Sequence, residues 1–279
     1  MVVMKVAIVI VTYNKPDIFE VCLQGVLNQT LRPFPIVVID NSNDNLTENI
    51  IKTRYPSVIY RHFHQNIGSA GGYFEGIKIA CEGSDFVWTL DDDIQSDPGT
   101  LAEAIAYVPL LSKKGRIGAL RSGWGFKVGD FKPIDSFAWR GALIACEAIK
   151  AIGLPDRDFF LYGEDVEYSL RLRKAGYLLF NVFAGRLQEI QPSPREIIAF
   201  LGIKFRFYAQ PFRLYYGFRN ELVLHYRYAK YLKYLKSLAY ALTGIIIFSI
   251  RHNPPSRQAI LRGVIDGFSG KLGKTYEDV

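Results

Sequence analysis

Short apolar runs alternate with amphipathic segments through the first half of the chain, and this alternation limits the possible folds more than any other feature. The apolar runs cover residues 6–11, 35–40, 58–64 and 86–90, and the segments between them, 16–29, 46–54 and 69–82, have helical spacing. Strands that alternate with helices form a mostly parallel sheet, because each helix returns the chain to the same end of the sheet. Residues 117–121 and 177–183 predict further strands, and residues 163–175 a further helix. The predicted class is α/β.

Polar residues follow several of these strands at the point where each one ends. The four clusters are Thr12–Asn14, Asp40–Ser42, Asn66–Gly72 and Asp91–Asp93. Ligands of parallel α/β sheets bind outside the carboxyl ends of the strands. We therefore expect the four clusters to converge on one edge of the sheet and to form a binding site there.

The triplet Asp91-Asp92-Asp93 directly follows the buried-strand pattern Phe-Val-Trp-Thr-Leu. Three adjacent carboxylates repel one another unless a cation neutralises them. Asp91 and Asp93, as alternate residues, can face the same way and hold a hard divalent ion, for which Mg²⁺ or Mn²⁺ suits oxygen ligands beside a diphosphate. The alternative is a solvated acidic turn before a helix. The position at a strand end favours the metal.

The other strand-end clusters fit a nucleotide, although each also has a purely structural explanation. The glycines of Asn66-Ile-Gly-Ser-Ala-Gly-Gly72 can let backbone N–H groups approach a phosphate at a helix N-terminus, or simply make a tight turn. Asp40 can accept a hydrogen bond from a base, and Thr12 and Asn14 can line the same pocket. Helix capping by the residues after Asp40 is the equal alternative.

A second acidic group, Glu164, Asp165 and Glu167, opens the helix predicted over residues 163–175. Carboxylates in the first turn of a helix are stabilised by its dipole, which is one explanation. The other is that one of them is a general base, which removes a proton from an acceptor hydroxyl. The sequence alone leaves both open.

The C-terminal third carries the positive charge of the chain. Residues 190–279 contain 14 Lys or Arg and 5 Asp or Glu, and the whole chain has a formal net charge of +7. We expect a helix there whose apolar stripe consists of Leu224, Tyr228, Tyr231, Leu235, Leu238 and Leu242, with lysines on the other faces. Such a helix suits an anionic membrane surface, or packs on the domain with solvated lysines. Nucleic acid is a weaker partner, because the aromatic residues lie on the apolar stripe.

Targeting signals and cysteines favour a cytoplasmic protein that is peripheral to the inner face of the membrane. The first apolar run is short and reads as a strand rather than a signal peptide, and no run of about 18 apolar residues predicts a transmembrane helix. Cys22, Cys81 and Cys146 are far apart and read as buried thiols in a reducing compartment.

Five motifs, in this order and spacing, resemble those of family 2 glycosyltransferases with the GT-A fold, in the branch of bacterial galactofuranosyl- and rhamnosyltransferases. They are Val11-Thr-Tyr-Asn14, Val38-Ile-Asp-Asn41, Asn66-x-Gly-x-x-Gly-Gly72, Leu90-Asp-Asp-Asp-Ile94 and Phe160-Leu-Tyr-Gly-Glu-Asp-Val-Glu-Tyr168. The resemblance covers residues 6–188. It implies a GT-A catalytic domain over residues 1–188, with a Rossmann-like sheet flanked by helices, and a helical, aromatic and basic region over residues 189–279.

The resemblance also implies an activity and a set of site residues. The activity is inverting transfer of a sugar, galactofuranose or rhamnose, from a UDP- or dTDP-sugar to a glycan or lipid-linked acceptor in cell-surface polysaccharide synthesis. Asp165 would be the base, and Glu164, Trp139 and Arg140 would bind the acceptor. The nucleotide sugar would be held by Thr12, Tyr13, Asn14, Asp40, Asn66, Gly68, Gly71, Gly72, Asp91 and Asp92. Asp91 and Asp93 would hold Mn²⁺ or Mg²⁺, which stabilises the departing nucleotide.

One motif departs from the family. Galactofuranosyltransferases of this branch have a Trp-His pair about twelve residues after the Gly-Tyr that ends the base helix, and that histidine completes the metal site. Here Gly176-Tyr177 leads to Leu187-Gln-Glu-Ile190, so that Glu189 lies nearest the histidine position. A carboxylate can also bind Mg²⁺ or Mn²⁺, so Glu189 is the candidate third ligand.

Two other classes of protein share part of this pattern. A nucleotidyltransferase also uses a nucleotide and a divalent metal, but it usually has a Gly-rich basic signature after the first strand, where this chain has Thr-Tyr-Asn-Lys-Pro. A catalytically weak module that binds nucleotide sugars is compatible with the missing histidine. Intact Asp91, Asp93 and Asp165 argue against that module.

Overall fold

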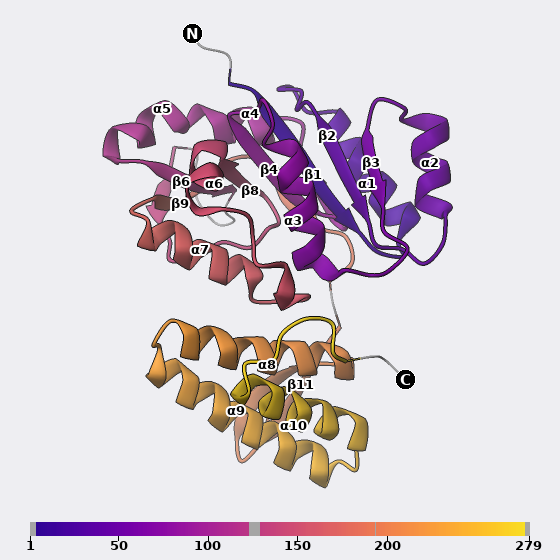
Figure 1. The fold of residues 1–279 in the computed structure, drawn as a ribbon, viewed down its shortest axis with the longest axis vertical. Coiled ribbons are helices and arrows are strands. Elements are labelled where there is room, and N and C mark those ends of the chain that lie inside the picture. Colours follow the sequence, from indigo (N-terminus) through magenta and orange to yellow (C-terminus); the bar gives the residue numbers. More distant parts are fainter. Residues whose placement is uncertain (1–3, 123–128, 193, 277–279) are drawn as a thin grey trace. The chain divides into compact units, whose positions relative to one another are not determined.

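The computed structural model describes residues 4–122, 129–192 and 194–276, and these divide into two compact units (Figure 1). The N-terminal unit contains residues 1–156 and 165–191, and the C-terminal unit contains residues 157–164 and 192–279. The division after residue 191 lies close to the predicted boundary at residue 188. The sequence did not indicate that residues 157–164 join the C-terminal unit.

An eight-stranded mixed sheet is the centre of the N-terminal unit, in the order β3-β2-β1-β4-β8-β6-β9-β7. The strands are β1 (Val6–Thr12), β2 (Ile36–Asp40), β3 (Ile59–His62), β4 (Phe86–Asp91), β6 (Ile117–Ser122), β7 (Phe131–Pro133), β8 (Ala142–Ala145) and β9 (Leu178–Val182). Strands β3, β2, β1 and β4 run parallel, as the alternation of apolar and amphipathic segments predicted. Strand β8 is antiparallel to both of its neighbours, because the chain enters it from a loop instead of a crossover helix.

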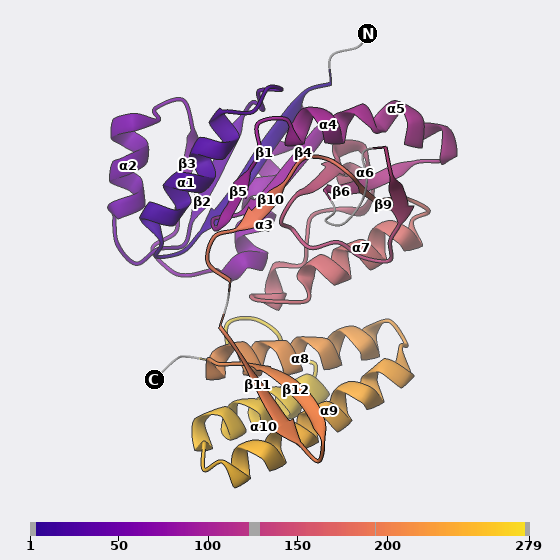
Figure 2. The same ribbon diagram turned by 180° about the vertical axis from the view of Figure 1, so that it is seen from behind.

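Helices cover both faces of this sheet (Figures 1 and 2). They are α1 (Pro16–Leu27), α2 (Leu46–Arg54), α3 (Gly68–Ala80), α4 (Thr100–Ala106), α5 (Val108–Leu111), α6 (Cys146–Ile152) and α7 (Glu164–Lys174). Helix α3 lies so close to β1 that a Cβ atom on Gly76 would be 2.3 Å from Cγ1 of Val9. This contact holds the middle of α3 against the middle of β1, and a Cβ atom on Gly72 would likewise lie 2.5 Å from Cγ1 of Val11, near the carboxyl end of β1.

A short ribbon of two strands crosses the end of the sheet, where β5 (Ile94–Ser96) pairs with β10 (Leu187–Glu189) in antiparallel fashion (Figure 2). Glu189 lies opposite Ile94, and the N–H of Ile190 donates to the carbonyl oxygen of Asp93 over 2.7 Å. The ribbon therefore brings residue 189 beside the aspartate triplet. Part of the hairpin or loop predicted over residues 123–136 lies outside the described residues, and its end forms β7.

The C-terminal unit consists of a hairpin, β11 (Arg195–Phe200) and β12 (Ile203–Tyr208), and three helices, α8 (Pro211–Arg227), α9 (Tyr231–Ile250) and α10 (Pro254–Phe268). The sequence analysis predicted the helices but not the hairpin. It was also wrong about a continuous helical stripe, because the chain breaks between α8 and α9, where Ala229 has a φ of 52°. Leu224 is consequently buried in α8, whereas Leu235 and Leu242 are exposed on α9.

A buried Arg-Asn pair on α8 holds the segment that precedes α7. Asn220 Nδ2 donates to the carbonyl oxygens of Phe159, Leu161 and Tyr162 over 2.8–2.9 Å. Arg219, which is fully buried, donates to the Phe159 carbonyl oxygen as well, over 2.9 Å. These contacts within the unit stabilise a loop in which Phe160, Tyr162 and Gly163 all have positive φ angles.

Candidate active site

Four parallel strands end at the same level of the sheet, and their last residues are polar. Thr12 pairs with Asp40, Asp40 pairs with His62, and Val11 pairs with Asp91. The register therefore brings three of the predicted strand-end clusters together, as expected from the binding position of parallel sheets.

Asp91 and Asp93 face a group of charged side chains, whereas Asp92 points into the protein. Asp91 Oδ1 accepts a hydrogen bond from the Tyr73 hydroxyl over 2.7 Å, and Asp93 Oδ2 lies 3.5 Å from Lys15 Nζ. Burial raises the pKa of Asp91, and burial together with the nearby Asp91 charge raises the pKa of Asp93 to about 6. The pair is thus short of positive charge.

Asp92 supports the turn after β1. Its Oδ2 accepts from the Thr12 hydroxyl over 2.9 Å and from the Tyr13 backbone N–H over 3.1 Å. Burial raises its pKa to about 7. Asp92 is only 8% exposed, its Oδ2 is occupied by these donors, and its Oδ1 lies 3.9 Å from Lys15 Nζ, so Asp92 positions Thr12, Tyr13 and Lys15 for a ligand.

The turn after β2 is tied to the turn after β1. The backbone N–H of Asn14 donates to Ser42 Oγ over 2.8 Å, and Asn14 Oδ1 accepts from the N–H of Asn43 over 3.0 Å. Asp40 is fully buried beneath this junction, where it accepts from Ser42 N and from the Tyr60 hydroxyl. Asp40 therefore shapes the turn, while Tyr13, 41% exposed, is available above it.

The Gly-rich segment begins α3 beside these turns. Asn66 Oδ1 accepts from the Gly68 N–H over 2.8 Å, and Gly68 has a φ of 75°, which favours glycine. A Cβ atom on Gly72 would lie 2.5 Å from Val11 Cγ1, and one on Gly71 would lie 3.0 Å from Ile67. Close packing against Val11 and Ile67 therefore accounts for glycine at positions 72 and 71. The part of the helix that lies next to the site is its start at residue 68.

Two arginines and Glu189 complete the charged group. Arg140 Nη1 donates to Glu189 Oε2 over 2.6 Å, and the charges of Asp91 and Asp93 also act on Arg140. Arg121, at the end of β6, is partly buried, and its Nε has no hydrogen-bond partner. Burial lowers the pKa of Arg121, the nearby Arg140 lowers it further, and Asp165 raises it.

Asp165 faces the same group from the start of α7. Burial raises the pKa of Asp165 to about 6, the Asp91 charge raises it as well, and Arg140 lowers it. Glu164, its neighbour in sequence, is buried and belongs to the C-terminal unit. We refer to Lys15, Asp91, Asp93, Arg121, Arg140, Asp165 and Glu189 as the charged cluster.

Trp139, which the resemblance assigned to the acceptor site, lies in the core. It is 4% exposed, and its ring stacks on Tyr73 with centroids 4.7 Å apart and contacts Tyr168 at 5.7 Å. Since Tyr73 donates to Asp91, Trp139 acts on the site only by supporting Tyr73.

The sequence analysis missed Lys15, Tyr73 and Arg121 as site residues. Arg121 ends a predicted strand, so the rule that ligands bind at strand ends could have indicated it. Lys15 follows the Thr12–Asn14 turn directly. Tyr73 had no comparable signal, because its role depends on the packing of α3 against β1.

The residues present fit a divalent cation that is shared with a ligand. Among residues 4–122, 129–192 and 194–276, no three His, Cys, Asp or Glu side chains form a ready-made metal cage. Asp91, Asp93 and Glu189 nevertheless offer carboxylate oxygens in one region. Besides burial, the charge of Glu189 raises the pKa of Asp91 and of Asp93, and the charge of Asp91 raises the pKa of Asp93. A hard cation with phosphate and water ligands would balance their charge.

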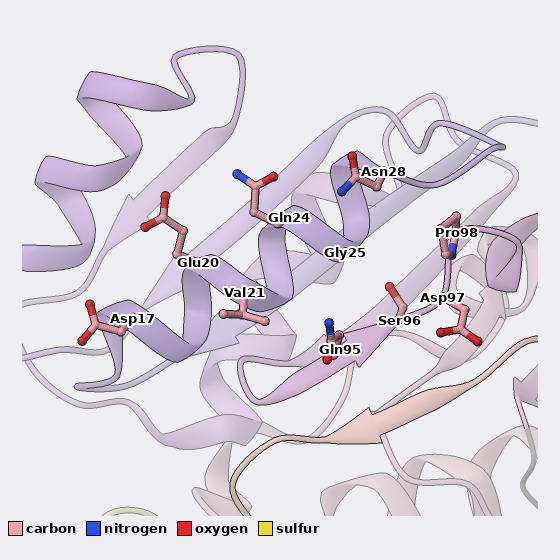
Figure 3. A pocket seen from close by; sticks show the side chains of 10 residues that line it. All are labelled: Asp17, Glu20, Val21, Gln24, Gly25, Asn28, Gln95, Ser96, Asp97 and Pro98. Carbon is pink, nitrogen blue, oxygen red and sulfur yellow. The ribbon is translucent and has the colours of Figure 1, made fainter.

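A separate cavity of about 490 Å³ lies along α1 and β5 (Figure 3). Its polar lining includes Asp17, Glu20, Gln24, Gln95 and Asp97. None of the charged cluster lines it, so it is a feature of the neighbouring surface and not the centre of the site.

Sequence comparison relates this chain to glycosyltransferases. Residues 7–120 match the family model "Glycosyl transferase family 2". The galactofuranosyltransferase GlfT1 of Mycolicibacterium smegmatis is 27% identical over 199 residues, which cover 61% of this chain and 66% of that protein. The GlfT1 protein of Mycobacterium tuberculosis is 27% identical over 195 residues, with 60% and 64% coverage. The match therefore spans just under two thirds of the length of these relatives.

Solved structures share the fold. A structure of GalNAc-T7 with UDP, GalNAc and Mn²⁺ has a TM-score of 0.61, at 18% identity, over 80% of this chain and 48% of that chain. The mannosyltransferase PcManGT of Pyrobaculum calidifontis, in complex with GDP-Man and Mn²⁺, has a TM-score of 0.59, at 14% identity, over 95% of this chain and 87% of that chain. The predicted fold class is thus confirmed.

Proposed function

We propose that this protein is a metal-dependent inverting glycosyltransferase related to galactofuranosyltransferases, because residues 7–120 match the family 2 glycosyl transferase model and the GlfT1 proteins are its relatives in sequence. The donor is a UDP- or dTDP-linked sugar, galactofuranose or rhamnose. The acceptor is a glycan or a lipid-linked glycan in cell-surface polysaccharide synthesis, reached from the cytoplasmic side. The observation that carries this proposal is the charged cluster, which collects four carboxylates and three basic side chains at the carboxyl end of the sheet.

The donor diphosphate is the charge that this cluster would accept. Lys15, Arg121 and Arg140 offer positive charge to its oxygens, and Arg121 does so with an N–H that is not otherwise used. Asp91, Asp93 and Glu189 would hold Mn²⁺ or Mg²⁺. When bound, this ion would stabilise the negative charge that develops on the departing nucleoside diphosphate. The linked turns at Thr12–Asn14 and Asp40–Asn43 would hold the nucleoside.

Asp165 is the candidate base for the acceptor. Its carboxylate would take the proton from an acceptor hydroxyl, whose oxygen bonds to the anomeric carbon as the bond from that carbon to the diphosphate breaks. A raised pKa suits this role, because it makes the carboxylate a better proton acceptor near neutral pH. Single displacement of this kind inverts the anomeric configuration.

The test is nucleotide release from a panel of UDP- and dTDP-sugars, with Mn²⁺, with Mg²⁺ and with EDTA. We expect release from one donor with metal only. Asp93→Ala and Asp165→Asn should each reduce the rate by a factor of at least about 100. The matched controls are Asp97→Ala and Asp97→Asn, because Asp97 is an exposed aspartate four residues after Asp93.

The possible results separate the three classes of protein. Nucleoside diphosphate that is released only with metal and is lost in both variants supports the transferase. Metal-dependent nucleotide binding without turnover on any donor, even with a crude lipid extract as a source of acceptor, supports a binding module. Pyrophosphate release from a nucleoside triphosphate and a sugar phosphate supports a nucleotidyltransferase. Equal rates for native protein and Asp93→Ala contradict the site.

A further inference from the structure

The outward side of α9 is apolar along its length. Its exposed stripe consists of Leu232, Leu235, Leu242, Ile246 and Ile250, each between 50% and 68% exposed. The opposite side is buried, with Ser237, Ala241, Gly244 and Phe248 in the core of the unit. A surface helix of a soluble protein normally has polar residues on the side that faces the solvent.

Helix α10 extends this apolar surface. The two helices pack side by side (Figures 1 and 2), and the rings of Tyr234 and Phe268 meet with centroids 6.1 Å apart. Leu261, Ile265 and Phe268 are between 47% and 60% exposed on α10. We call these three residues and the α9 stripe the α9–α10 face. Exposed apolar side chains that gather on neighbouring helices mark interaction surfaces.

Basic residues outnumber acidic ones at the edges of the face, where Arg251 pairs with Glu196 over 3.1 Å and Lys271 with Asp266 over 3.9 Å. The stretch from residue 237 to residue 250 contains no Lys, Arg, Asp or Glu, and it is bounded by Lys236 and Arg251. Lys233, Arg257 and Lys271 are also exposed near the ends of these helices. Apolar side chains bordered by lysine and arginine are typical of segments that lie at the surface of an anionic bilayer.

We propose that the α9–α10 face inserts into the headgroup boundary of an anionic lipid bilayer, with α9 lying along the membrane. This inference does not depend on the proposed transfer reaction. The apolar side chains would leave water for the acyl boundary, while the flanking basic side chains would contact lipid phosphates.

The packing of α9 favours a helix that lies on the membrane over one that crosses it. By length and composition alone α9 could span a bilayer, and only 28% of its most apolar window is buried. However, a Cβ on Gly244 would lie 2.9 Å from Ile260 and 3.0 Å from Phe207, so this side of α9 is in close contact with α10 and β12. A spanning helix would have to leave those contacts.

A second copy of the chain is a poorer occupant of the face. Two copies that met through this face would bring their basic borders together, and like charges at an interface oppose association. Anionic lipid has the complementary charge.

The test is sedimentation of the full chain with vesicles of phosphatidylcholine containing 30% phosphatidylglycerol, a composition chosen as a probe. The double variant Leu242→Glu, Ile246→Glu should weaken binding by about 100-fold or more, because two apolar side chains are replaced by charges. The matched control is Leu46→Glu, Leu110→Glu, which makes the same change at two exposed leucines of the N-terminal unit and should bind like the native protein.

A second measurement reports insertion directly. The tryptophans of this chain are Trp88, Trp124 and Trp139, and all of them precede residue 157 in the sequence, where the C-terminal unit begins. Leu242→Trp should show a blue-shifted emission with vesicles and additional quenching by brominated lipid, and Leu110→Trp should show neither. This conservative variant keeps the test decisive if the double glutamate variant does not fold.

Several results would overturn the proposal. Undiminished binding by Leu242→Glu, Ile246→Glu, or binding that 0.5 M salt abolishes completely, would mean that basic residues alone hold the lipid. Absence of vesicle binding, together with a dimer in analytical ultracentrifugation that the double variant dissociates, would assign the face to a second copy.

Discussion

The two units both bury arginine, but they treat its charge differently. Arg219 of the C-terminal unit is fully buried and donates to the carbonyl oxygens of Phe159 and Gly273 and to side-chain oxygens of Asn220 and Thr275. Arg121 of the N-terminal unit lies among other charges and keeps an Nε without a partner. Neutral carbonyl, amide and hydroxyl oxygens thus accept the hydrogen bonds of Arg219, whereas Arg121 lacks such a set of acceptors among the described residues.

This difference distinguishes an arginine that stabilises the fold from one that is available to a ligand. A buried charge whose hydrogen bonds are complete stabilises one conformation. A group of charges with raised carboxyl pKa values and an unused donor lowers stability until a ligand completes it. The charged cluster is therefore where we expect ligand binding, and Arg219 is where we expect a purely structural contribution.

Replacing each arginine by methionine tests this comparison, and of our predictions it should give the largest change in stability. Arg219→Met would leave several buried oxygens without a donor, so we expect a loss of about 3–5 kcal/mol in the free energy of unfolding. Arg121→Met should change stability by less than about 1 kcal/mol and should lower nucleotide affinity. Urea denaturation and nucleotide titration measure the two effects. Equal destabilisation by both variants would remove the distinction.

The pH dependence of stability in the metal-free protein is a second test of the comparison between the two units. Burial raises the pKa of Asp92 to about 7 in the folded protein, and the unfolded value is about 3.9. The folded protein thus binds this proton more tightly than the unfolded chain does. Above about pH 7 the ionised, buried carboxylate lowers the free energy of unfolding, and protonation removes this loss as the pH falls toward 4. We expect the native protein to gain about 2 kcal/mol between pH 8 and pH 5 from this group.

Asp92→Asn supplies the control for that measurement, because the amide oxygen can still accept from Thr12 and Tyr13. The variant should show a smaller gain on acidification, measured by urea denaturation with EDTA. His225, whose pKa burial lowers, opposes the gain equally in both proteins. Parallel pH curves for the two proteins would show that Asp92 is not the source.

The smallest expected effect concerns the tyrosine that holds Asp91. Tyr73→Phe keeps the stacking on Trp139 but removes the hydroxyl, so we expect a loss of about 1 kcal/mol in stability and a rate of transfer reduced about five- to tenfold. Tyr168→Phe also removes a buried hydroxyl hydrogen bond, to the Gly153 carbonyl oxygen, away from the carboxylates. It should lose similar stability without loss of activity, and similar rates for both variants would contradict the role of Tyr73.

Much of the N-terminal unit could be predicted from the sequence, because its signals are local. The strand over residues 6–11 and the helix over residues 16–29 both appear in the structure near those positions. The convergence of Thr12, Asp40 and Asp91 also follows from strand ends alone. Which carboxylates face a ligand could not be predicted. The inward direction of Asp92 is set by Thr12 and Tyr13, which lie about eighty residues away in sequence.

The C-terminal unit was less predictable, because its boundaries depend on long-range packing. The helical spacing of leucines and tyrosines continued through residues 228–230, where the chain in fact turns. Residues 157–164 are held by Asn220, about sixty positions later, and no local pattern reveals that contact.

The pairing of β10 with β5 has a consequence for the order in which the protein is built. Glu189 reaches the aspartate triplet only after nearly a hundred intervening residues have been synthesised and folded back. Contacts so distant in sequence form late. During synthesis Asp91 and Asp93 therefore exist first without Arg140 and Glu189. The emerging chain carries a bare acidic turn, and the proposed nucleotide site is complete only when the sheet is nearly finished.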